Sequence, residues 1–198
     1  MTEPEPRSKS ESRSPTLEKT GDGSHTLYSN RFNQHYHNPN GAVGESLHVF
    51  FHKNGLLDRL TLEDSTEPLS ILEVGFGSGL NLLLLLDEYL KCGATFPVTY
   101  CSIEAYPIGE SIARTLNYGN YLVNRDLADR LVEIFREARP GMNRFELLPG
   151  VELLLFVGMF DAFDPGKFRA DFIFHDPFSP EANPDLWSGE VFGKLAGW

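Results

Sequence analysis

The stretch "SILEVGFGSGLN", residues 70–81, constrains the fold of this chain more than any other part of it. An apolar run breaks into glycines at positions 75, 77 and 79, and the chain then continues as "LNLLLLLDEYLK", residues 80–91. A short run of Leu, Ile and Val suits a buried parallel strand, and the second run is made of strong helix formers. The pattern therefore predicts a strand, a tight glycine turn, and a helix packed against a sheet.

The same alternation continues along the chain. Further strands are predicted in 97–107, ending near Glu104, in 143–158, with a bend at Pro149 and Gly150, and in 170–180, ending at Asp176. Helices are predicted at about 109–117, at 125–138, and from 185 onward, while "ESLHVFF", residues 45–51, fits either a strand or the start of a helix. Alternating strands and helices indicate an α/β fold with a parallel sheet, in which ligands bind at the carboxyl ends of the strands.

Composition divides the chain and limits its partners. Residues 1–25 are rich in Ser, Glu, Pro, Lys and Arg, so we expect a disordered tail there and one packed domain in 26–198. The formal net charge of -11 comes without an obvious basic face, so affinity for any nucleic acid should be weak and salt-sensitive. The first residues lack the apolar stretch of a signal peptide, and the Leu run is shorter than the roughly 20 residues that span a bilayer. A cytoplasmic protein with no membrane contact and two free thiols, Cys92 and Cys101, is predicted.

The glycine turn has the features of a ligand loop. Gly75 and Gly77 would bring the amides around Phe76 and Ser78 close to a ligand, and Gly79 would let the next helix approach the strand. A dinucleotide fingerprint requires a third glycine where this chain has Leu80, which disfavours a nicotinamide-dependent oxidoreductase. Glu104, at the end of the next strand, is placed to accept both hydroxyls of a ribose. A purely steric turn and a surface carboxylate are the alternatives.

Three motifs, "EVGFGSGLN", "SIEAYP" and "DPFSPEANPDLW", resemble in order and spacing the methyltransferase domain of the bacterial family that completes the 5-methylaminomethyl-2-thiouridine modification of the tRNA wobble position. The likeness runs from about Tyr28 to the end of the chain. It implies a Rossmann-like class I methyltransferase fold, S-adenosylmethionine as cofactor, tRNA as partner, and methyl transfer to the exocyclic amine of 5-aminomethyl-2-thiouridine.

The resemblance also assigns roles to residues. Glu73 and the 75–79 loop would hold the amino-acid end of the cofactor, and Glu104 its ribose. Asp176 would orient the acceptor amine or take its proton, although an Asp before Pro177 can also simply cap a turn. The residues that would shape the pocket for the wobble base are Glu45, Phe178, Asn183 and Trp187. Trp187 fits a core anchor better, and Glu45 fits surface charge equally well.

Two departures from the family are visible. The family usually has Gly-Asp after the third strand, with the Asp on the adenine, whereas this chain has Gly158 and Met159; Asp161 is the nearest substitute. The resemblance also implies a sheet that continues beyond the fourth parallel strand, so we expect a truncated fold with "DFIFH" as an exposed edge. A partner chain or an oxidoreductase component would complete the pathway. A noncatalytic nucleoside-binding fragment is the alternative outside enzymes.

The histidines suggest a metal site only weakly. His35 and His37 are two residues apart, and His48 and His52 are four apart, which is a helical ligand spacing. No Cys or carboxylate completes a known ligand motif, so no metal is predicted.

Overall fold

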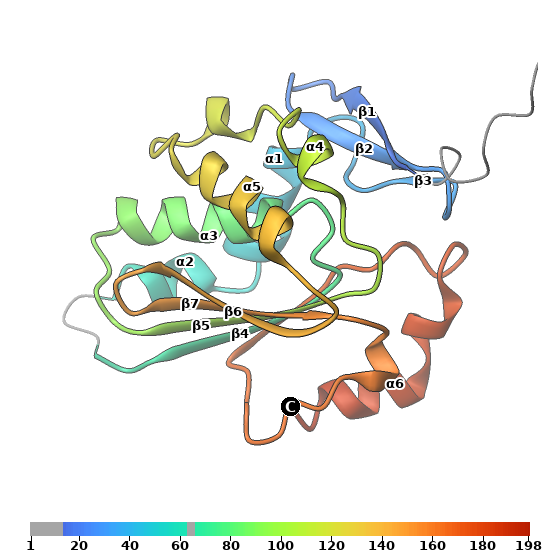
Figure 1. Ribbon diagram of the computed structural model, residues 1–198. Coiled ribbons are helices and arrows are strands. Elements are labelled where there is room, and N and C mark those ends of the chain that lie inside the picture. Colours follow the sequence, from blue (N-terminus) through green and yellow to red (C-terminus); the bar gives the residue numbers. More distant parts are fainter. Residues whose placement is uncertain (1–13, 63–65) are drawn as a thin grey trace, which may run out of the picture.

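A five-stranded sheet with helices on both faces forms the body of the computed structural model, which describes residues 14–62 and 66–198. The strands lie in the order β6-β7-β5-β4-β8, and a separate three-stranded sheet, β1-β2-β3, stands beside the helices of one face (Figure 1). The strands of the large sheet are β4 (Leu69–Val74), β5 (Val98–Glu104), β6 (Gly141–Leu148), β7 (Val151–Val157) and β8 (Phe172–His175). Those of the small sheet are β1 (Thr16–Lys19), β2 (His25–Ser29) and β3 (Gln34–His35).

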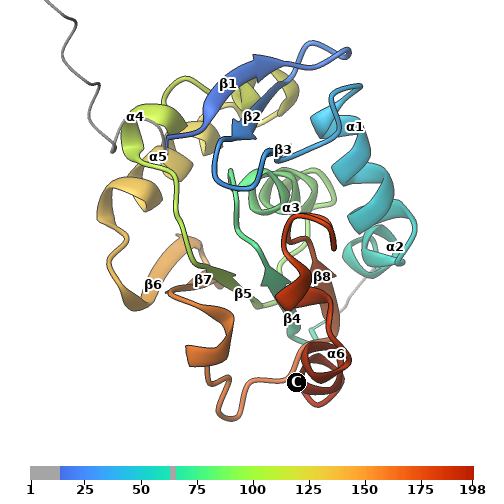
Figure 2. The ribbon, with the colours of Figure 1, turned by 90° about the vertical axis from the view of Figure 1, so that its right-hand side faces the viewer.

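Two layers of helices enclose the large sheet. One face carries α1 (Ala42–Ser46), α2 (Leu56–Leu60), α3 (Leu80–Lys91), α4 (Glu110–Ala113) and α5 (Leu127–Glu137), and the other carries α6 (Gly189–Leu195) (Figures 1 and 2). Short turns of other helix types complete the chain: η2 (Leu47–His52), η3 (Tyr118–Tyr121), η4 (Phe160–Ala162) and η5 (Pro184–Trp187). The predicted α/β architecture is confirmed. No helix within the described ranges is both long and apolar enough to cross a membrane.

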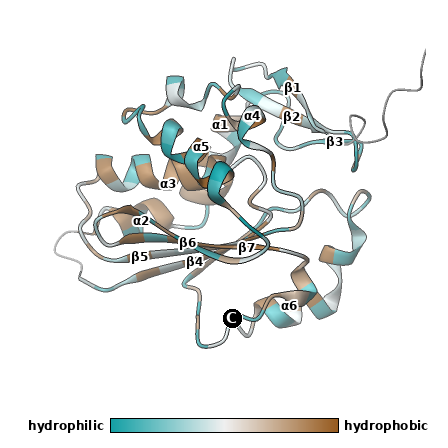
Figure 3. Ribbon diagram, viewed as in Figure 1, coloured by the Kyte–Doolittle hydropathy of each residue, from teal (hydrophilic) through white to brown (hydrophobic). Residues whose placement is uncertain are grey.

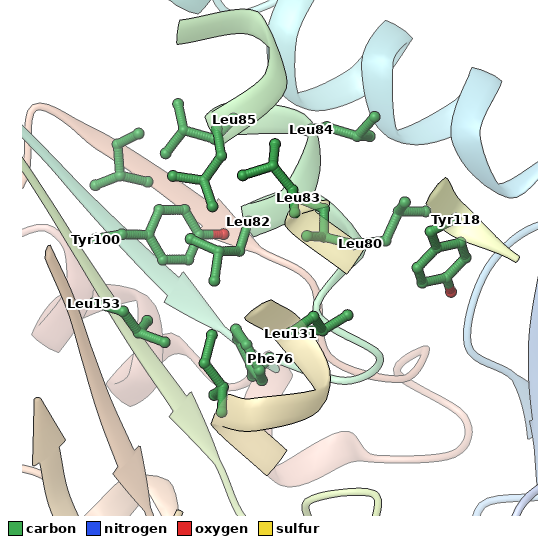
Figure 4. Packing of buried hydrophobic residues seen from close by; sticks show 14 of the residues in the cluster. Phe76, Leu80, Leu82, Leu83, Leu84, Leu85, Tyr100, Tyr118, Leu131 and Leu153 are labelled. Carbon is green, nitrogen blue, oxygen red and sulfur yellow. The ribbon is translucent and has the colours of Figure 1, made fainter. Parts of the chain in front are cut away.

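Helix α3 lies at the centre of the core, as its sequence predicts. Its leucines 82–86 are at most 2% exposed, because β4 and β5 cover one side of the helix and α5, α1 and α2 cover the others. Figure 4 shows Leu82, Leu83, Leu84 and Leu85 of this helix packed in the core with Phe76, Tyr100 and Leu131. Figure 3 shows the same helix as apolar over most of its surface, whereas the exposed side of α5 is polar.

The predicted third strand is wrong as a single strand. Residues 141–157 form a hairpin in which β6 runs antiparallel to β7, while β7 is parallel to β5. Pro149 and Gly150 make a complete turn instead of a bend, because Gly150 has a φ of 79°. Side chains alternate in burial along β6, as in an antiparallel strand with one face toward solvent. The parallel strands of this sheet are therefore β4, β5, β7 and β8.

The structure decides one open prediction and shortens one predicted helix. The stretch 42–52 is helical, α1 followed by η2, because Phe51 can then be fully buried while His48 and Val49 face solvent. The ring of Phe50 lies 4.9 Å from that of Phe174 on β8. The helix predicted at 109–117 is only the four residues of α4, and η3 follows it after a break.

The predicted tail is wrong for residues 14–25. Strand β1 pairs with β2 from Thr16 opposite Tyr28 to Lys19 opposite His25. All four of its side chains are exposed, so backbone pairing orders the strand and burial does not, which composition cannot reveal. Residues 1–13, which carry the rest of that prediction, lie outside the described residues. At the other side of the molecule β8 is an edge strand, as expected, with Ile173 37% exposed.

Candidate active site

The glycine turn joins β4 to α3 at the carboxyl ends of the parallel strands. Gly75, Gly77 and Gly79 have φ values of 94°, 56° and 77°, a region that disfavours side chains. A Cβ on Gly75 would stand 2.7 Å from the carbonyl oxygen of Asp176, and one on Gly79 would collide with Leu131 of α5. The glycines are therefore needed both for the turn and for close packing around it.

A cavity of about 910 Å³ opens over this turn and over the ends of β4, β5 and β8. Ten of the residues predicted from the sequence line it: Glu45, Gly75, Phe76, Gly77, Ser78, Glu104, Asp161, Asp176, Phe178 and Asn183. Glu73, Gly79 and Trp187 do not. The structure thus brings most of the predicted site together in one hollow that is large enough for a nucleoside and an acceptor.

Most amides of the glycine turn are already bonded within the protein. Those of Gly75 and Phe76 donate to the carbonyl of Ile103, at 2.9 and 3.3 Å, and that of Gly77 donates to the Glu104 carboxylate at 2.8 Å. Among residues 75–79, the N–H of Ser78 makes no hydrogen bond within the described residues. A ligand would meet this amide and the free first-turn amides of α3. The turn therefore offers a ligand fewer free amides than the sequence suggests: the Ser78 amide is available and the Phe76 amide is not.

Glu104 is the last residue of β5 and lines the cavity. Its Oε2 accepts the Gly77 amide and its Oε1 accepts the Tyr106 amide at 2.7 Å. Burial raises the pKa of Glu104, and these backbone amides oppose the rise. Each carboxylate oxygen can accept a second hydrogen bond, so the residue is positioned by the backbone and can still accept from two vicinal hydroxyls.

Glu73 stands behind the cavity wall. The residue is 1% exposed, with Oε2 accepting from Ser102 at 2.7 Å and Oε1 from Asn81 at 3.0 Å. Burial raises the pKa of Glu73 to about 7, against the hydrogen bonds from Ser102 and Asn81. Because Glu73 is buried and does not line the cavity, whereas its partner Asn81 does, Glu73 is linked to the cavity through Asn81.

Asp176 follows β8 directly and faces the cavity. Its backbone amide donates to the carbonyl of Val74 at 3.0 Å, while its Oδ2 accepts from Asn81 at 3.0 Å. Burial raises the pKa of Asp176 well above its usual range, and the nearby Glu73 raises it further. The side chain makes no bond to the backbone of the next turn within the described residues, so a capping role is not what holds it.

The opposite wall comes from a segment whose role the sequence did not reveal. Phe32 and the run from Gln34 to Pro39 line the cavity. The Phe32 ring stacks on that of Phe178 with centroids 4.4 Å apart, and Gln34 Oε1 accepts the Ser179 amide at 3.0 Å. No alternation in the sequence marks this wall, because Phe32 lies in a turn with Asn33 at a φ of 53°, and the neighbouring residues His35 and Tyr36 both line the cavity.

The remaining predicted residues differ in how they meet the cavity. Trp187 is only partly buried; it donates from Nε1 to the carbonyl of Phe178 at 2.8 Å and packs its ring edge-on to His175, so it braces the loop. The Asp161 side chain is 84% exposed and pairs with Lys194 at 3.2 Å, at the rim. Glu45 accepts the Asn38 amide at 2.7 Å. Asn183 lines the cavity just before η5.

No three His, Cys, Asp or Glu side chains lie close enough to hold a metal ion in residues 14–62 and 66–198. His48 and His52 are both exposed on the η2 turn.

Comparisons with known proteins agree with this geometry. The model of a family described as S-adenosyl-L-methionine-dependent methyltransferase matches residues 124–198. The tRNA 5-methylaminomethyl-2-thiouridine biosynthesis bifunctional protein MnmC of Leptospira borgpetersenii is 35% identical over 173 residues, which is 86% of this chain and 26% of that protein. The MnmC of Campylobacter fetus is 33% identical over 178 residues, 89% of this chain and 27% of that protein. This chain thus spans about a quarter of the length of these curated relatives.

A solved structure extends the likeness to three dimensions. The crystal structure of MNMC2 from Aquifex aeolicus superposes with a TM-score of 0.72 at 25% identity, over 92% of this chain and 55% of that one. The fold, the glycine turn and the strand-end carboxylates define a Rossmann-like S-adenosylmethionine-dependent methyltransferase domain. More particularly, the chain is an MnmC-like methyltransferase domain.

The residues present fit S-adenosylmethionine. The positive-φ glycines, the unbonded Ser78 amide and the anchored Glu104 carboxylate suit the amino-acid and ribose parts of such a nucleoside. When bound, this cofactor supplies a methyl group on a positively charged sulfur. The chain itself has to hold the two reactants in line and to take a proton from the acceptor.

Proposed function

We propose that this domain transfers a methyl group from S-adenosylmethionine to the exocyclic amine of 5-aminomethyl-2-thiouridine at the wobble position of tRNA. The observation that carries the proposal is the position of Asp176. Asp176 lines the wall of the cavity two residues before Phe178, and its backbone carbonyl packs against Gly75 of the glycine turn. The names of the curated relatives, which concern biosynthesis of the same modified uridine, support this choice of acceptor.

Different walls of the cavity are proposed to bind the cofactor and the acceptor base. Glu104 and the glycine turn take the cofactor on one side. Phe32 and Phe178 form an apolar stacked pair on the other, which suits the face of an unstacked base. Asp176 lies between them and takes the proton that the amine loses as its nitrogen bonds the methyl carbon. In its ionised form the carboxylate also attracts the amine and fixes its direction.

Partners beyond this chain belong to the proposal as well. We infer that tRNA is the macromolecular substrate, which would place the protein in the cytoplasm, and that an oxidoreductase component acts in the same pathway. Asp161 remains the proposed adenine contact, although in this structure it would first have to leave Lys194.

Methyl transfer to a defined tRNA tests the function. The substrate is tRNA that carries 5-aminomethyl-2-thiouridine, incubated with S-adenosylmethionine labelled in its methyl group. We expect label in the RNA with the wild-type chain and with Asp164→Ala, which removes an exposed carboxylate outside the cavity lining. Asp176→Ala should abolish transfer and leave cofactor binding, measured by titration calorimetry, unchanged.

Two results separate the proposal from its rivals. Cofactor binding by the wild-type chain without any transfer would identify a noncatalytic nucleoside-binding domain. Equal loss of binding and transfer in Asp176→Ala would make the role of Asp176 structural.

A further inference from the structure

Asn81 is the second residue of α3 and joins two carboxyl groups from different strands. Its side-chain nitrogen lies 3.0 Å from Oε1 of Glu73, on β4, and 3.0 Å from Oδ2 of Asp176, after β8. An amide nitrogen carries two hydrogens, so both bonds can form at once. Asn81 is 3% exposed, and it still lines the cavity.

The orientation of the amide is set by these two carboxyl groups. Turning the side chain over would place Oδ1 against two acceptor groups. In the observed orientation Oδ1 is buried without a hydrogen-bond partner among the described residues. A buried acceptor without a partner is costly, so the two bonds to carboxyl groups must outweigh that cost. The Asn81 side chain is therefore oriented to hold Asp176, although its own oxygen is left without a hydrogen bond.

Glu73 serves as the anchor in this arrangement. Its other oxygen is held by Ser102 of β5, a residue that is itself fully buried. The chain of contacts runs from Ser102 through Glu73 and Asn81 to Asp176, from the middle of the sheet to the cavity wall. By contrast, Oδ1 of Asp176 makes no hydrogen bond to any of the described residues.

We propose that Asn81 is a positioning residue, which holds Oδ2 of Asp176 against the Glu73 anchor so that Oδ1 receives the hydrogen of the acceptor amine. In this step the amine nitrogen bonds the methyl carbon, the bond from carbon to the sulfonium sulfur breaks with its electron pair going to sulfur, and the proton of the new ammonium passes to Oδ1. The catalytic part of this inference rests on the proposed function. The placement of Asp176 does not.

Several other groups bear on the charge of Asp176. Glu73 on β4 and Glu45 on α1 both disfavour its ionised form, and Tyr100 on β5 also faces this cluster. His175 precedes Asp176 in the chain and packs against Trp187 on its other side. The bond from Asn81 favours the ionised form of Asp176. Removing the donor should therefore leave Asp176 protonated to higher pH.

A titration that needs no activity tests the placement. Carboxyl carbons of the full chain, labelled with ¹³C, are followed by NMR against pH, with the Asp176 signal assigned from Asp176→Asn. We expect Asn81→Ala to move the Asp176 midpoint upward by about one pH unit, the loss of one charge-assisted hydrogen bond. Asn81→Ser, which restores one donor, should move it less. Unchanged midpoints in both variants would overturn the proposal.

A matched control separates positioning from general damage. Asp87→Asn perturbs another buried polar network on the same helix, where Asp87 accepts the amides of Val123 and Asn124 at 3.2 and 2.8 Å. We expect it to lower the melting temperature without moving the Asp176 midpoint. An equal shift in Asp87→Asn would show that any loosening of α3 has this effect, and Asn81 would lose its special role.

Kinetics separate this inference from the proposed function. If the wild-type chain transfers methyl groups, Asn81→Ala should lower kcat at pH 7 by about 10- to 100-fold, move the acid limb of the rate profile upward, and leave the Kd of S-adenosylmethionine unchanged. If wild type transfers none while the NMR midpoint moves as expected, the proposed function fails and the placement of Asp176 by Asn81 holds.

Discussion

The carbonyl oxygen of Asp176 lies 2.7 Å from the point where a Cβ on Gly75 would stand. The glycine turn and the backbone of Asp176 are thus packed closely together, although 101 positions of sequence separate Gly75 from Asp176. This contact follows from the parallel pairing of β4 with β8. Val74 lies opposite His175 at the ends of these strands, so the next residues, Gly75 and Asp176, come together. The same pairing makes Gly75 sensitive to any side chain.

Gly75→Ala should weaken cofactor binding strongly. Alanine at a φ of 94° carries a backbone penalty of about 1–2 kcal/mol, and its methyl group would also push Asp176 outward. Gly93→Ala is the matched control, since Gly93 has a φ of 65° and open space around its Cβ position. We expect Gly75→Ala to lose more stability in urea than Gly93→Ala, because its methyl group also meets backbone atoms, and only Gly75→Ala to lose affinity for S-adenosylmethionine by calorimetry. Equal affinities would contradict a role for the close contact.

Glu73 should make the folded state less stable as the pH rises. Its pKa is about 7 in the fold against 4.5 for the free side chain, so between these values the folded state binds more protons than the unfolded one. The contribution of Glu73 to the free energy of unfolding is therefore largest below about pH 4.5, decreases between about pH 4.5 and 7, and is smallest above about pH 7. A tenfold change in an equilibrium constant is worth about 1.4 kcal/mol, so ionising Glu73 in the fold costs roughly 3 kcal/mol.

Glu73→Gln tests this sign. The variant removes the ionisation, and Ser102 can turn its hydroxyl to accept from the new amide. Its unfolding free energy relative to wild type should rise between pH 4.5 and 7 in urea titrations. Glu190→Gln, at a 77% exposed side chain, should give a flat difference over the same range. A relative stability of Glu73→Gln that falls with pH would reverse the argument.

Features that depend on residues close together in the sequence could be predicted, whereas features that depend on contacts between distant segments could not. Helix 80–91 and the strand ending at Glu104 are confirmed, because a continuous apolar run and a local glycine turn determine them. The convergence of Glu104 and Asp176 was also predictable, since carboxyl ends of parallel strands meet at one edge. The β6–β7 hairpin was missed, because an antiparallel partner at the end of a sheet leaves only a weak alternation in the sequence.

The wall formed by Phe32 and Gln34 depends on contacts that no local pattern contains. Gln34 bonds the amide of Ser179, which is 145 residues away in the chain. For a similar reason the sequence places Asn81 in the predicted helix 80–91 without indicating a role for it. Its role appears only when β4 and β8 bring two carboxyl groups to the same end of α3.

Trp187 should stabilise the loop that carries Phe178 through its indole N–H. Trp187→Phe keeps an aromatic ring against His175 but removes the donor to the Phe178 carbonyl. We expect a loss of about 1 kcal/mol in the free energy of unfolding, with the affinity for S-adenosylmethionine unchanged. Trp198→Phe is a suitable control, because Trp198 packs on Phe160 and Phe163 and its indole makes no hydrogen bond to the described residues. Similar losses in both variants would point to ring packing as the source.

Arg31 should contribute to tRNA binding through its charge. Its guanidinium lies 3.8 Å above the exposed ring of Tyr106, next to Phe32 at the cavity. In a chain of net charge -11, a cation held at this place is well suited to meet an RNA phosphate. We expect Arg31→Ala to raise the KM for tRNA several-fold, without changing the Kd of S-adenosylmethionine.

Salt dependence distinguishes a phosphate contact from a general charge effect. If Arg31 meets one phosphate, the slope of log affinity against log salt for tRNA should become less steep by roughly one in Arg31→Ala. Arg136→Ala removes the same charge from the exposed side of α5, where Arg136 pairs with Glu137, and its slope should match wild type. Parallel slopes for all three proteins would mean that Arg31 holds Tyr106 in place and does not touch the RNA. In that case the affinity for tRNA would depend on how well the cation holds the Tyr106 ring. A Lys ammonium stacks on a ring less well than a guanidinium, so Arg31→Lys should then restore less than half of the affinity lost in Arg31→Ala.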